Sequence, residues 1–286
     1  LNLTVINSGT IWAKEDYGIK LIEAEKITIT NEAGGTIKAT PTDSGALYAI
    51  GGTKMGNCST CVNGSTTSSG EGLTLHNYGT IDAHSRTVYG GHASGHTSKK
   101  TKIYNYDGGM IDATASSTLK FQYAEDFELY NYSGATIQAG SKYAIEAKEA
   151  STVTIDNAGT ISAVTTDTIY CVSCSDVTLT NSGNITSGGT NAVRLDSVSG
   201  TNTITNSGTI SAVGSRAIRI TSATGVTITN EAGGTISSTG LIGIGADNAF
   251  SPTIINYGTI SATHTSALGI NLTQSDAENL GSGATI

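Results

Sequence analysis

The sequence predicts an all-β fold, a parallel β-helix with three strands per coil and about ten coils. Three observations carry this prediction: a repeat of about 24 residues, an asparagine before a glycine turn in every repeat, and three short alternating stretches between the turns. Only 13% of the 286 residues are charged and 6% are aromatic, with 36 Gly against 2 Pro. This composition favours short strands joined by Gly/Asn turns, arranged as one solenoid over residues 1–286.

The repeat is best preserved in the decapeptide TITNEAGGTI, which stands unchanged at 28–37 and at 227–236. The asparagines that open the turns are Asn7, Asn31, Asn77, Asn105, Asn131, Asn157, Asn181, Asn206, Asn230 and Asn256. They follow one another at intervals of 24 to 28 residues, except for one interval of 46. We expect the long interval to hold a loop insertion near 51–70, and the next coil to carry a second loop near 90–100.

Each repeat supplies three strands. The first reads Thr-Ile-x-Ala, as at 160–163; the second is like 217–220; the third reads Val-Thr-Ile-Thr-Asn, as at 226–230. Alternation places the aliphatic side chains on one face and the polar ones on the other. Because no single repeat can close a core, each strand should pair with its copy in the next coil, about 4.8 Å away.

The recurrent asparagine fits an internal ladder. Its amide both donates and accepts along the axis, and asparagine tolerates the left-handed conformation that turns a chain. The glycine that follows is expected to supply a positive φ at the same corner.

Units such as ITNSGTISA at 204–212 resemble the passenger domains of Gram-negative autotransporters, the type V secreted surface proteins. The resemblance covers essentially the whole chain and implies a right-handed coil, display at the extracellular cell surface, and a role in adhesion and virulence. It also implies that an outer-membrane β-barrel translocator follows the passenger in the full-length protein. Since that barrel is absent and the chain opens in a strand-like run, we expect a fragment of a longer passenger.

The charge of the chain limits its partners. With a net charge of −8 and a pI near 5.0, it lacks the clustered Lys and Arg that nucleic-acid binding requires. No nucleotide-binding loop or calcium repeat is present, so no cofactor is expected.

The four cysteines form two Cys-x-x-Cys pairs, Cys58/Cys61 and Cys171/Cys174. Local disulfides are the favoured interpretation for an exported protein. Shared zinc would need the two pairs to be close, although they lie about four coils apart. A redox role lacks its βαβ setting, and free thiols are the remaining alternative.

Histidines gather near the second loop, where His92 and His96 stand four residues apart, downstream of His76 and His84. The spacing superficially resembles half of a zinc finger, but the gap to Cys61 is too long and the segment is not helical. We therefore expect no metal site and interpret this segment as a polar loop. Both loops should leave the coil after the second strand, and projecting loops commonly bind partners. His92 and His96 are thus candidate binding residues.

Successive repeats place equivalent residues in columns on the surface. The outward position of the first strand runs Trp12, Lys38, Asp82, Asp112, Gln138, Ser162, Thr186, Ser211, Ser237 and Ser261. The positions flanking the asparagine give His76, Tyr104 and Tyr130 on one side and Tyr78, Tyr106 and Tyr132 on the other. These aromatic residues should form a patch over three coils beside Asp82 and Asp112.

The patch has three interpretations. Tyrosines beside carboxylates can bind sugar rings, since apolar ring faces pack on aromatics and carboxylates accept hydroxyl hydrogen bonds. It could equally dock a protein, or the tyrosines could simply cover one another and the corner.

We expect a non-catalytic adhesin segment that attaches to a host-cell glycan or protein receptor, or to a second copy of itself. One alternative is a structural stalk that presents another domain. Another is a polysaccharide-cleaving enzyme, because Asp82 and Asp112 one coil apart approach the ~5 Å separation of retaining glycosidases. No acidic triad with a nearby Arg or His supports this last alternative.

Overall fold

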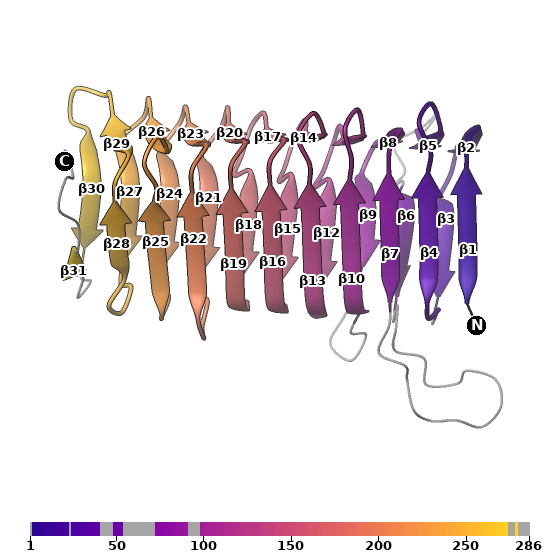
Figure 1. The fold of residues 1–286 in the computed structure, drawn as a ribbon, viewed down its shortest axis with the longest axis horizontal. Helices are drawn as coiled ribbons and strands as arrows, with labels where there is room; N and C mark the ends of the chain where they lie inside the picture. The colour runs from indigo at the N-terminus through magenta and orange to yellow at the C-terminus, as the bar shows by residue number, and fades with distance from the viewer. Residues whose placement is uncertain are drawn as a thin grey trace.

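The computed structural model confirms the parallel β-helix with three strands per coil (Figure 1). It describes residues 2–22, 24–40, 48–53, 72–90, 98–273 and 278–279. Within these ranges every regular element is a strand, and all strand pairs are parallel. The handedness implied by the resemblance stays a prediction.

Every third strand pairs with its copy in the next coil, which produces three sheets. Sheet A contains 11 strands that lead to the asparagine corner: β1 (Leu3–Asn7), β4 (Ile27–Asn31), β7 (Leu73–Asn77), β10 (Ser98–Asn105), β13 (Ala124–Asn131), β16 (Ser151–Asn157), β19 (Ser175–Asn181), β22 (Asn202–Asn206), β25 (Val226–Asn230), β28 (Thr253–Asn256) and β31 (Glu278–Asn279). Sheet B contains the 10 Thr-Ile-x-Ala strands: β2 (Thr10–Ala13), β5 (Thr36–Ala39), β8 (Thr80–Ala83), β11 (Met110–Ala113), β14 (Thr136–Ala139), β17 (Thr160–Ala163), β20 (Asn184–Ser187), β23 (Thr209–Ala212), β26 (Thr235–Ser238) and β29 (Thr259–Ala262). Sheet C contains the remaining 10: β3 (Tyr17–Ile22), β6 (Tyr48–Thr53), β9 (Arg86–Gly90), β12 (Leu119–Gln122), β15 (Ile145–Lys148), β18 (Ile169–Val172), β21 (Asn191–Asp196), β24 (Arg216–Thr221), β27 (Ile242–Asp247) and β30 (Leu268–Thr273).

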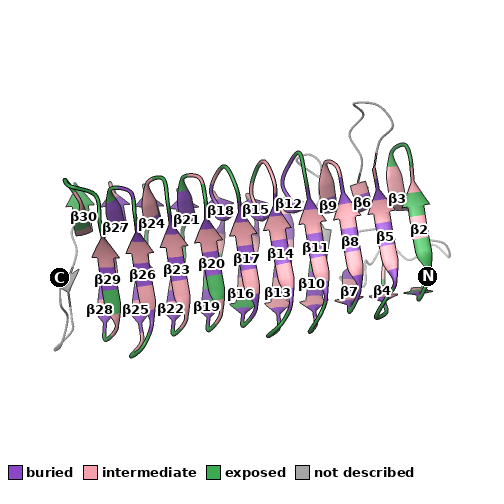
Figure 2. Ribbon diagram, turned by 90° about the horizontal axis from the view of Figure 1, so that it is seen from above, coloured by how far each residue is buried: buried purple, intermediate pink, exposed green. Residues whose placement is uncertain are grey.

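The core runs along the axis between the three sheets. Inward positions of each strand alternate with outward ones, as the banding of burial along the strands shows (Figure 2). Ile, Val, Leu and Ala fill the interior, and Phe121 stacks on Phe127 with ring centroids 4.3 Å apart. Each buried aliphatic side chain contributes about 1.5–3 kcal/mol relative to exposure, so the sum over the coils stabilises the rod.

All ten asparagines form one continuous ladder, as predicted. In the first nine, the side-chain Nδ2 donates to Oδ1 of the asparagine in the next coil, over distances of 2.7 to 2.9 Å. In the central coils Nδ2 also donates to the carbonyl of the first sheet B residue of the following coil, as from Asn131 to Thr160 at 3.2 Å. These bonds satisfy the amides, which are almost fully buried.

The predicted backbone role of the ladder asparagines was wrong. None of the ten has a positive φ, so they act through their side chains alone. Glycine follows for two different reasons. In the longer corners Gly34, Gly108, Gly134 and Gly233 do have φ between 75° and 87°. In short corners the reason is contact: a Cβ on Gly79 would lie 2.3 Å from the carbonyl oxygen of Gly35 in the preceding coil.

The segments predicted as loops fall in the sequence between β6 and β7 and between β9 and β10. Residues 51–53 belong to β6 and residues 98–100 to β10, so these parts of the two segments are strands. Pairing with the neighbouring coils extends both strands into the predicted loops. Residues 54–71 and 91–97 lie outside the described residues, so Cys58, Cys61, His92 and His96 are not placed.

Candidate functional site

The six aromatic residues singled out from the sequence do come together. His76, Tyr104 and Tyr130 are Cα partners on β7, β10 and β13, and their side chains point outward from sheet A. Tyr78, Tyr106 and Tyr132 follow the ladder asparagines of the same three coils. We call these six side chains the aromatic ladder.

The rings of the aromatic ladder stack on one another along the axis. In the corner column, Tyr78 and Tyr106 have centroids 4.2 Å apart and planes 3° from parallel, and Tyr106 and Tyr132 are 5.0 Å apart at 11°. In the sheet A column, His76–Tyr104 and Tyr104–Tyr130 are each 5.0 Å apart at 7° and 6°. The coil spacing of about 4.8 Å sets these separations.

Stacking changes what the ladder can offer a ligand. Neighbouring rings cover one another's faces, so the interior rings present edges and hydroxyl groups to solvent. Tyr78 and Tyr132, at the ends of the corner column, are 40% and 41% exposed and each have one face without a stacked ring in the described part of the chain. Flat packing of a sugar on the ladder is thus limited to the ends of the two columns, and the remaining surface is an array of hydrogen-bonding groups.

One hydrogen bond joins the two columns, and others fix the sheet A column in place. His76 Nδ1 lies 3.0 Å from the Tyr106 hydroxyl. The Tyr130 hydroxyl donates to Glu128 Oε2 at 3.0 Å, and Glu128 also pairs with Lys102 at 2.9 Å. The ladder is therefore preorganised, and a ligand would meet it with little loss of side-chain entropy.

Burial keeps these groups neutral. Burial raises the pKa of Tyr106 to about 12, with hydrogen bonding to Tyr78 adding to the effect. The pKa of Tyr130 is also raised to about 12, first by burial and then by its bond to Glu128. Burial lowers the pKa of His76, which favours the neutral imidazole. The ladder consequently presents uncharged donors and acceptors at neutral pH.

Asp82 and Asp112 are Cα partners on sheet B, as predicted. Asp82 pairs with Lys38 at 3.7 Å, while burial raises the pKa of Asp112 and Gln138 donates a hydrogen bond to it. Neither aspartate has a hydrogen bond or ion pair with a ladder tyrosine among the described residues. Asp82 follows Tyr78 by four residues and Asp112 follows Tyr106 by six, on the next sheet. That the aspartates and the tyrosines bind a ligand as one patch stays a prediction.

The predicted disulfide between Cys171 and Cys174 was wrong for this structure, because both thiols are free and buried. Cys171 points into the core from β18, between Ala147 and Leu195 of the adjacent coils. Cys174 Sγ donates to the Ala147 carbonyl at 3.4 Å. The hydrogen bond with Cys174 and burial both raise the pKa of Cys171, so this thiol stays protonated.

Other candidate ligands for a metal are dispersed. His84 Nδ1 lies 3.4 Å from the Thr114 hydroxyl on the surface. Within the described ranges no three His, Cys, Asp or Glu side chains group closely enough to hold a metal ion.

Sheet C carries aromatic stacks that the sequence analysis missed. Tyr17, Tyr48 and Tyr89 stack at 4.8 and 5.4 Å, and the Arg86 guanidinium lies over both Tyr48 and Tyr89. Tyr143 and Tyr170 form a second, tilted pair at 4.9 Å. Reading the outward positions of the second strand coil by coil, as was done for the first, would have found these residues.

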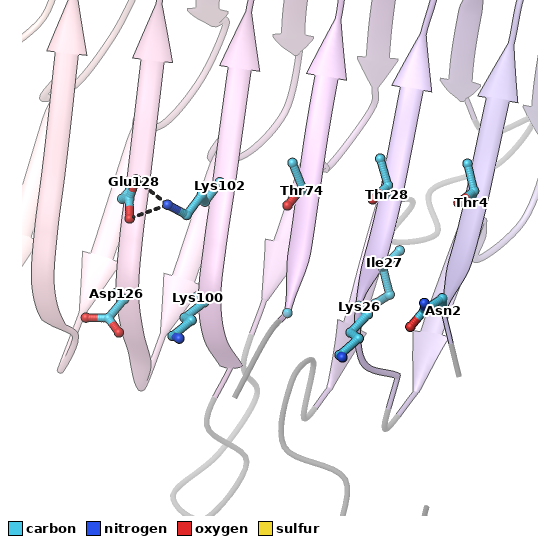
Figure 3. A pocket seen from close by; sticks show the side chains of 11 residues that line it. Asn2, Thr4, Lys26, Ile27, Thr28, Thr74, Lys100, Lys102, Asp126 and Glu128 are labelled. Carbon is cyan, nitrogen blue, oxygen red and sulfur yellow. Dashed lines mark hydrogen bonds and ion pairs between the residues drawn. The ribbon is translucent and has the colours of Figure 1, made fainter. Parts of the chain in front are cut away.

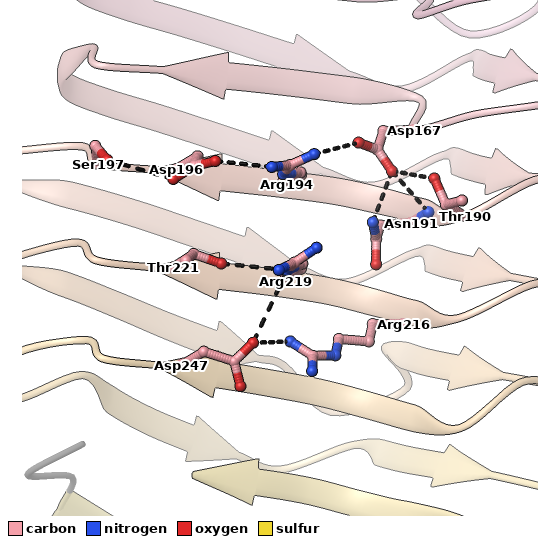
Figure 4. Close-up of polar contacts among 10 residues, drawn as sticks. All are labelled: Asp167, Thr190, Asn191, Arg194, Asp196, Ser197, Arg216, Arg219, Thr221 and Asp247. Atoms are coloured by element: carbon pink, nitrogen blue, oxygen red, sulfur yellow. Dashed lines mark hydrogen bonds and ion pairs between the residues drawn. The ribbon is translucent and has the colours of Figure 1, made fainter. Parts of the chain in front are cut away.

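A network of ion pairs continues along sheet C (Figure 4). Arg194 lies between Asp167 at 3.6 Å and Asp196 at 2.8 Å, and its guanidinium also covers the Tyr170 ring at 4.7 Å. On the next coil Arg216 bonds Asp247 of the coil after it, and the Arg216 side chain lies over Gly245, where a Cβ would come within 2.9 Å. Arg194 and Arg216 each pair with a carboxylate, so their charges are neutralised within the surface. These ion pairs therefore stabilise the stacking of the coils and are poorly suited to binding a charged ligand.

The aromatic ladder is thus the candidate site, because it concentrates Tyr and His side chains on the outward surface and holds them by stacking and hydrogen bonds. The chain matches no known family model, and no curated protein and no solved structure is similar to it. Within the part of the chain that the structure describes, no helix has the length and apolar character of a membrane span.

Proposed function

We propose that this chain is a non-catalytic binding segment of a bacterial surface adhesin. The observation that carries the proposal is the aromatic ladder: six preorganised side chains on three consecutive coils of a rigid rod. The resemblance to autotransporter passengers supports display at the cell surface. Glycans are the receptor class that the ladder fits best, since rows of hydroxyl groups and ring edges match a polyhydroxylated polymer.

The proposed mechanism is summation of weak contacts. Equivalent positions recur about every 4.8 Å along the axis, so a polymer aligned with the rod would meet the same chemistry at successive coils. Each contact is weak, and several engaged together give useful affinity through effective concentration.

Attachment of chain-coated beads to cultured cells, together with a glycan array, tests the proposal. The triple variant Tyr78→Ala, Tyr106→Ala, Tyr132→Ala should lower attachment about tenfold or more, because buried tyrosines at interfaces each contribute more than about 1 kcal/mol. Tyr257→Ala is the matched control: Tyr257 also follows a ladder asparagine and is 53% exposed, but lies far outside the ladder. Far-ultraviolet circular dichroism verifies that the variants stay folded.

Attachment equal to that of the unmodified chain would reject the ladder as the binding site. The beads could instead cluster with one another. If the triple variant abolishes this clustering, the ladder mediates self-association and not binding to a receptor.

A stalk is the second candidate, favoured by the unbroken asparagine ladder from Asn7 to Asn256. The outward column of sheet B beyond Gln138 contains only Ser and Thr, as expected of a spacer. A stalk predicts that removing one whole coil, such as residues 182–206, leaves attachment unchanged.

A further inference from the structure

The outward face of sheet A is hollowed beside the aromatic ladder (Figure 3). The hollow has a volume of about 720 Å³ and extends across the starts of β1, β4, β7, β10 and β13. Two of its lining residues, Thr74 and Lys102, precede His76 and Tyr104 by two positions on the same strands. Residues two apart in a strand face the same side, so the hollow and the ladder share one surface.

Apart from Ile27, the lining forms two rows that cross the coils. The first row contains the residue directly before β1 and its equivalents in the next four coils: Asn2, Lys26, Gly72, Lys100 and Asp126. The second row contains Thr4, Thr28, Thr74, Lys102 and Glu128, which are Cα partners in register.

Gly72 creates the depth of the hollow. It has no side chain, and its neighbours in the first row are Lys26 on one side and Lys100 on the other. These two lysines are two coils apart, about 10 Å at the coil spacing. Lys26 and Lys100 have positive φ values of 52° and 45°, respectively, so both mark the same sharp corner between sheets C and A.

Hydroxyl groups form the floor in front of Gly72. Thr28 and Thr74 are Cα partners, and neither hydroxyl has a hydrogen-bond partner in the described part of the protein. Branching at Cβ restricts their rotamers, so the hydroxyl groups are held in place. A ligand would find two preorganised hydroxyl groups between two lysines.

The charges are distributed asymmetrically. Lys102 is paired with Glu128 at 2.9 Å, which neutralises that end of the second row. Lys100 is exposed and has no ion pair among the described residues, and the carboxylates of the lining both lie on β13. Among the described residues of the first row, the gap at Gly72 is therefore flanked by two lysines, on a chain whose net charge is −8.

We infer that this hollow binds an acidic sugar unit, a uronate or a sulfated residue of a polysaccharide. The anionic group enters the gap at Gly72 between Lys26 and Lys100, and the sugar hydroxyls bond Thr28 and Thr74. Asp126 and Glu128 accept hydroxyl hydrogen bonds from the next unit, and the polymer then continues over the aromatic ladder. This inference rests on the proposed function and names the chemistry of its ligand.

Binding to immobilised polymers tests the inference. Polygalacturonate supplies carboxylates, heparin supplies sulfates, and dextran is the neutral comparison. The double variant Lys26→Gln, Lys100→Gln should raise the dissociation constant for at least one of the two acidic polymers about tenfold, which equals ~1.4 kcal/mol. Lys142→Gln is the matched control, since Lys142 is exposed on the opposite corner and outside the hollow. Added salt should weaken binding of the unmodified chain, because it screens exposed charges.

Several outcomes would overturn the inference: dextran bound as tightly as both acidic polymers, neither acidic polymer bound, or the double variant bound as tightly as the unmodified chain. The proposed function is judged separately by cell attachment of the triple tyrosine variant. If the triple tyrosine variant loses attachment and the lysine substitutions have no effect, the proposed adhesion is supported and the acidic ligand is rejected. If the lysine substitutions weaken binding and the tyrosine substitutions have no effect, the binding site is the hollow and not the aromatic ladder.

Discussion

Removing one central member of the asparagine ladder should destabilise the whole rod. Asn131 is 1% exposed. Its Oδ1 accepts from Asn105 at 2.9 Å, and its Nδ2 donates to Asn157 Oδ1 at 2.7 Å and to the Thr160 carbonyl at 3.2 Å. The substitution Asn131→Ala deletes these three bonds and leaves the Asn157 oxygen without its ladder donor.

The magnitude follows from the orphaned groups. Two buried acceptors lose a partner, and each buried unsatisfied polar group costs about 1–3 kcal/mol, so the free energy of unfolding should fall by about 2–6 kcal/mol. Domains have a free energy of unfolding of about 5–15 kcal/mol, so this loss is a large fraction of the total stability. Thr154→Ala on the outward face of sheet A is the control, and should change stability by no more than about 0.5 kcal/mol.

Urea unfolding followed by far-ultraviolet circular dichroism measures both variants. The midpoint should fall in Asn131→Ala with little change in slope. A further variant, Asn131→Asp, keeps the shape but places a carboxyl group against two oxygens. Burial raises the pKa of that carboxyl in the folded state, so the unfolded state ionises first, and the variant should lose stability as pH rises above about 4. Equal midpoints for Asn131→Ala and Thr154→Ala would refute the idea that the ladder stabilises the fold.

Three more outcomes follow from the geometry. Gly79→Ala should destabilise the protein by about 1–3 kcal/mol, because its Cβ would lie 2.3 Å from a backbone oxygen, whereas Gly9→Ala, with nothing within 4 Å, should be nearly neutral in the same unfolding assay. The free energy of unfolding should decline as pH rises from about 10 to 12, because Tyr106 and Tyr130 have pKa values of about 12 in the folded state and near 10.0 in the unfolded state. Phenolate absorbance measured during the titration tests this. Ionisation of all tyrosines together near 10 would disprove it. Cys171 should resist a maleimide reagent in the folded protein and react fully in urea, measured by mass spectrometry, and fast labelling of the folded protein would contradict its burial.

The candidate site was partly predictable for a simple reason. In a solenoid, residues at equivalent repeat positions occupy one column, so His76, Tyr104 and Tyr130 could be grouped without coordinates. Column reading could not give the orientation of the rings, which depends on rotamers and on the coil spacing. It left open whether the rings offer their faces to a sugar or cover one another, and the structure has them stacked. It did place Asp82 on the first strand of its repeat, which is β8 of sheet B in the structure.

The sequence by itself determined the coil, its three strands, the ten-membered ladder and the surface columns, because each is a consequence of periodicity and in-register pairing. The tertiary structure decided what depends on close approach between coils. It showed that a glycine is needed at position 79 because the neighbouring backbone leaves no room for a Cβ, and not because of its φ. It also showed that Cys171 faces the core as a free thiol. It also showed that Gly72 opens a hollow between two lysines. These features join residues 24 to 74 positions apart, and only the stacking of the coils brings their atoms within a few ångströms of each other.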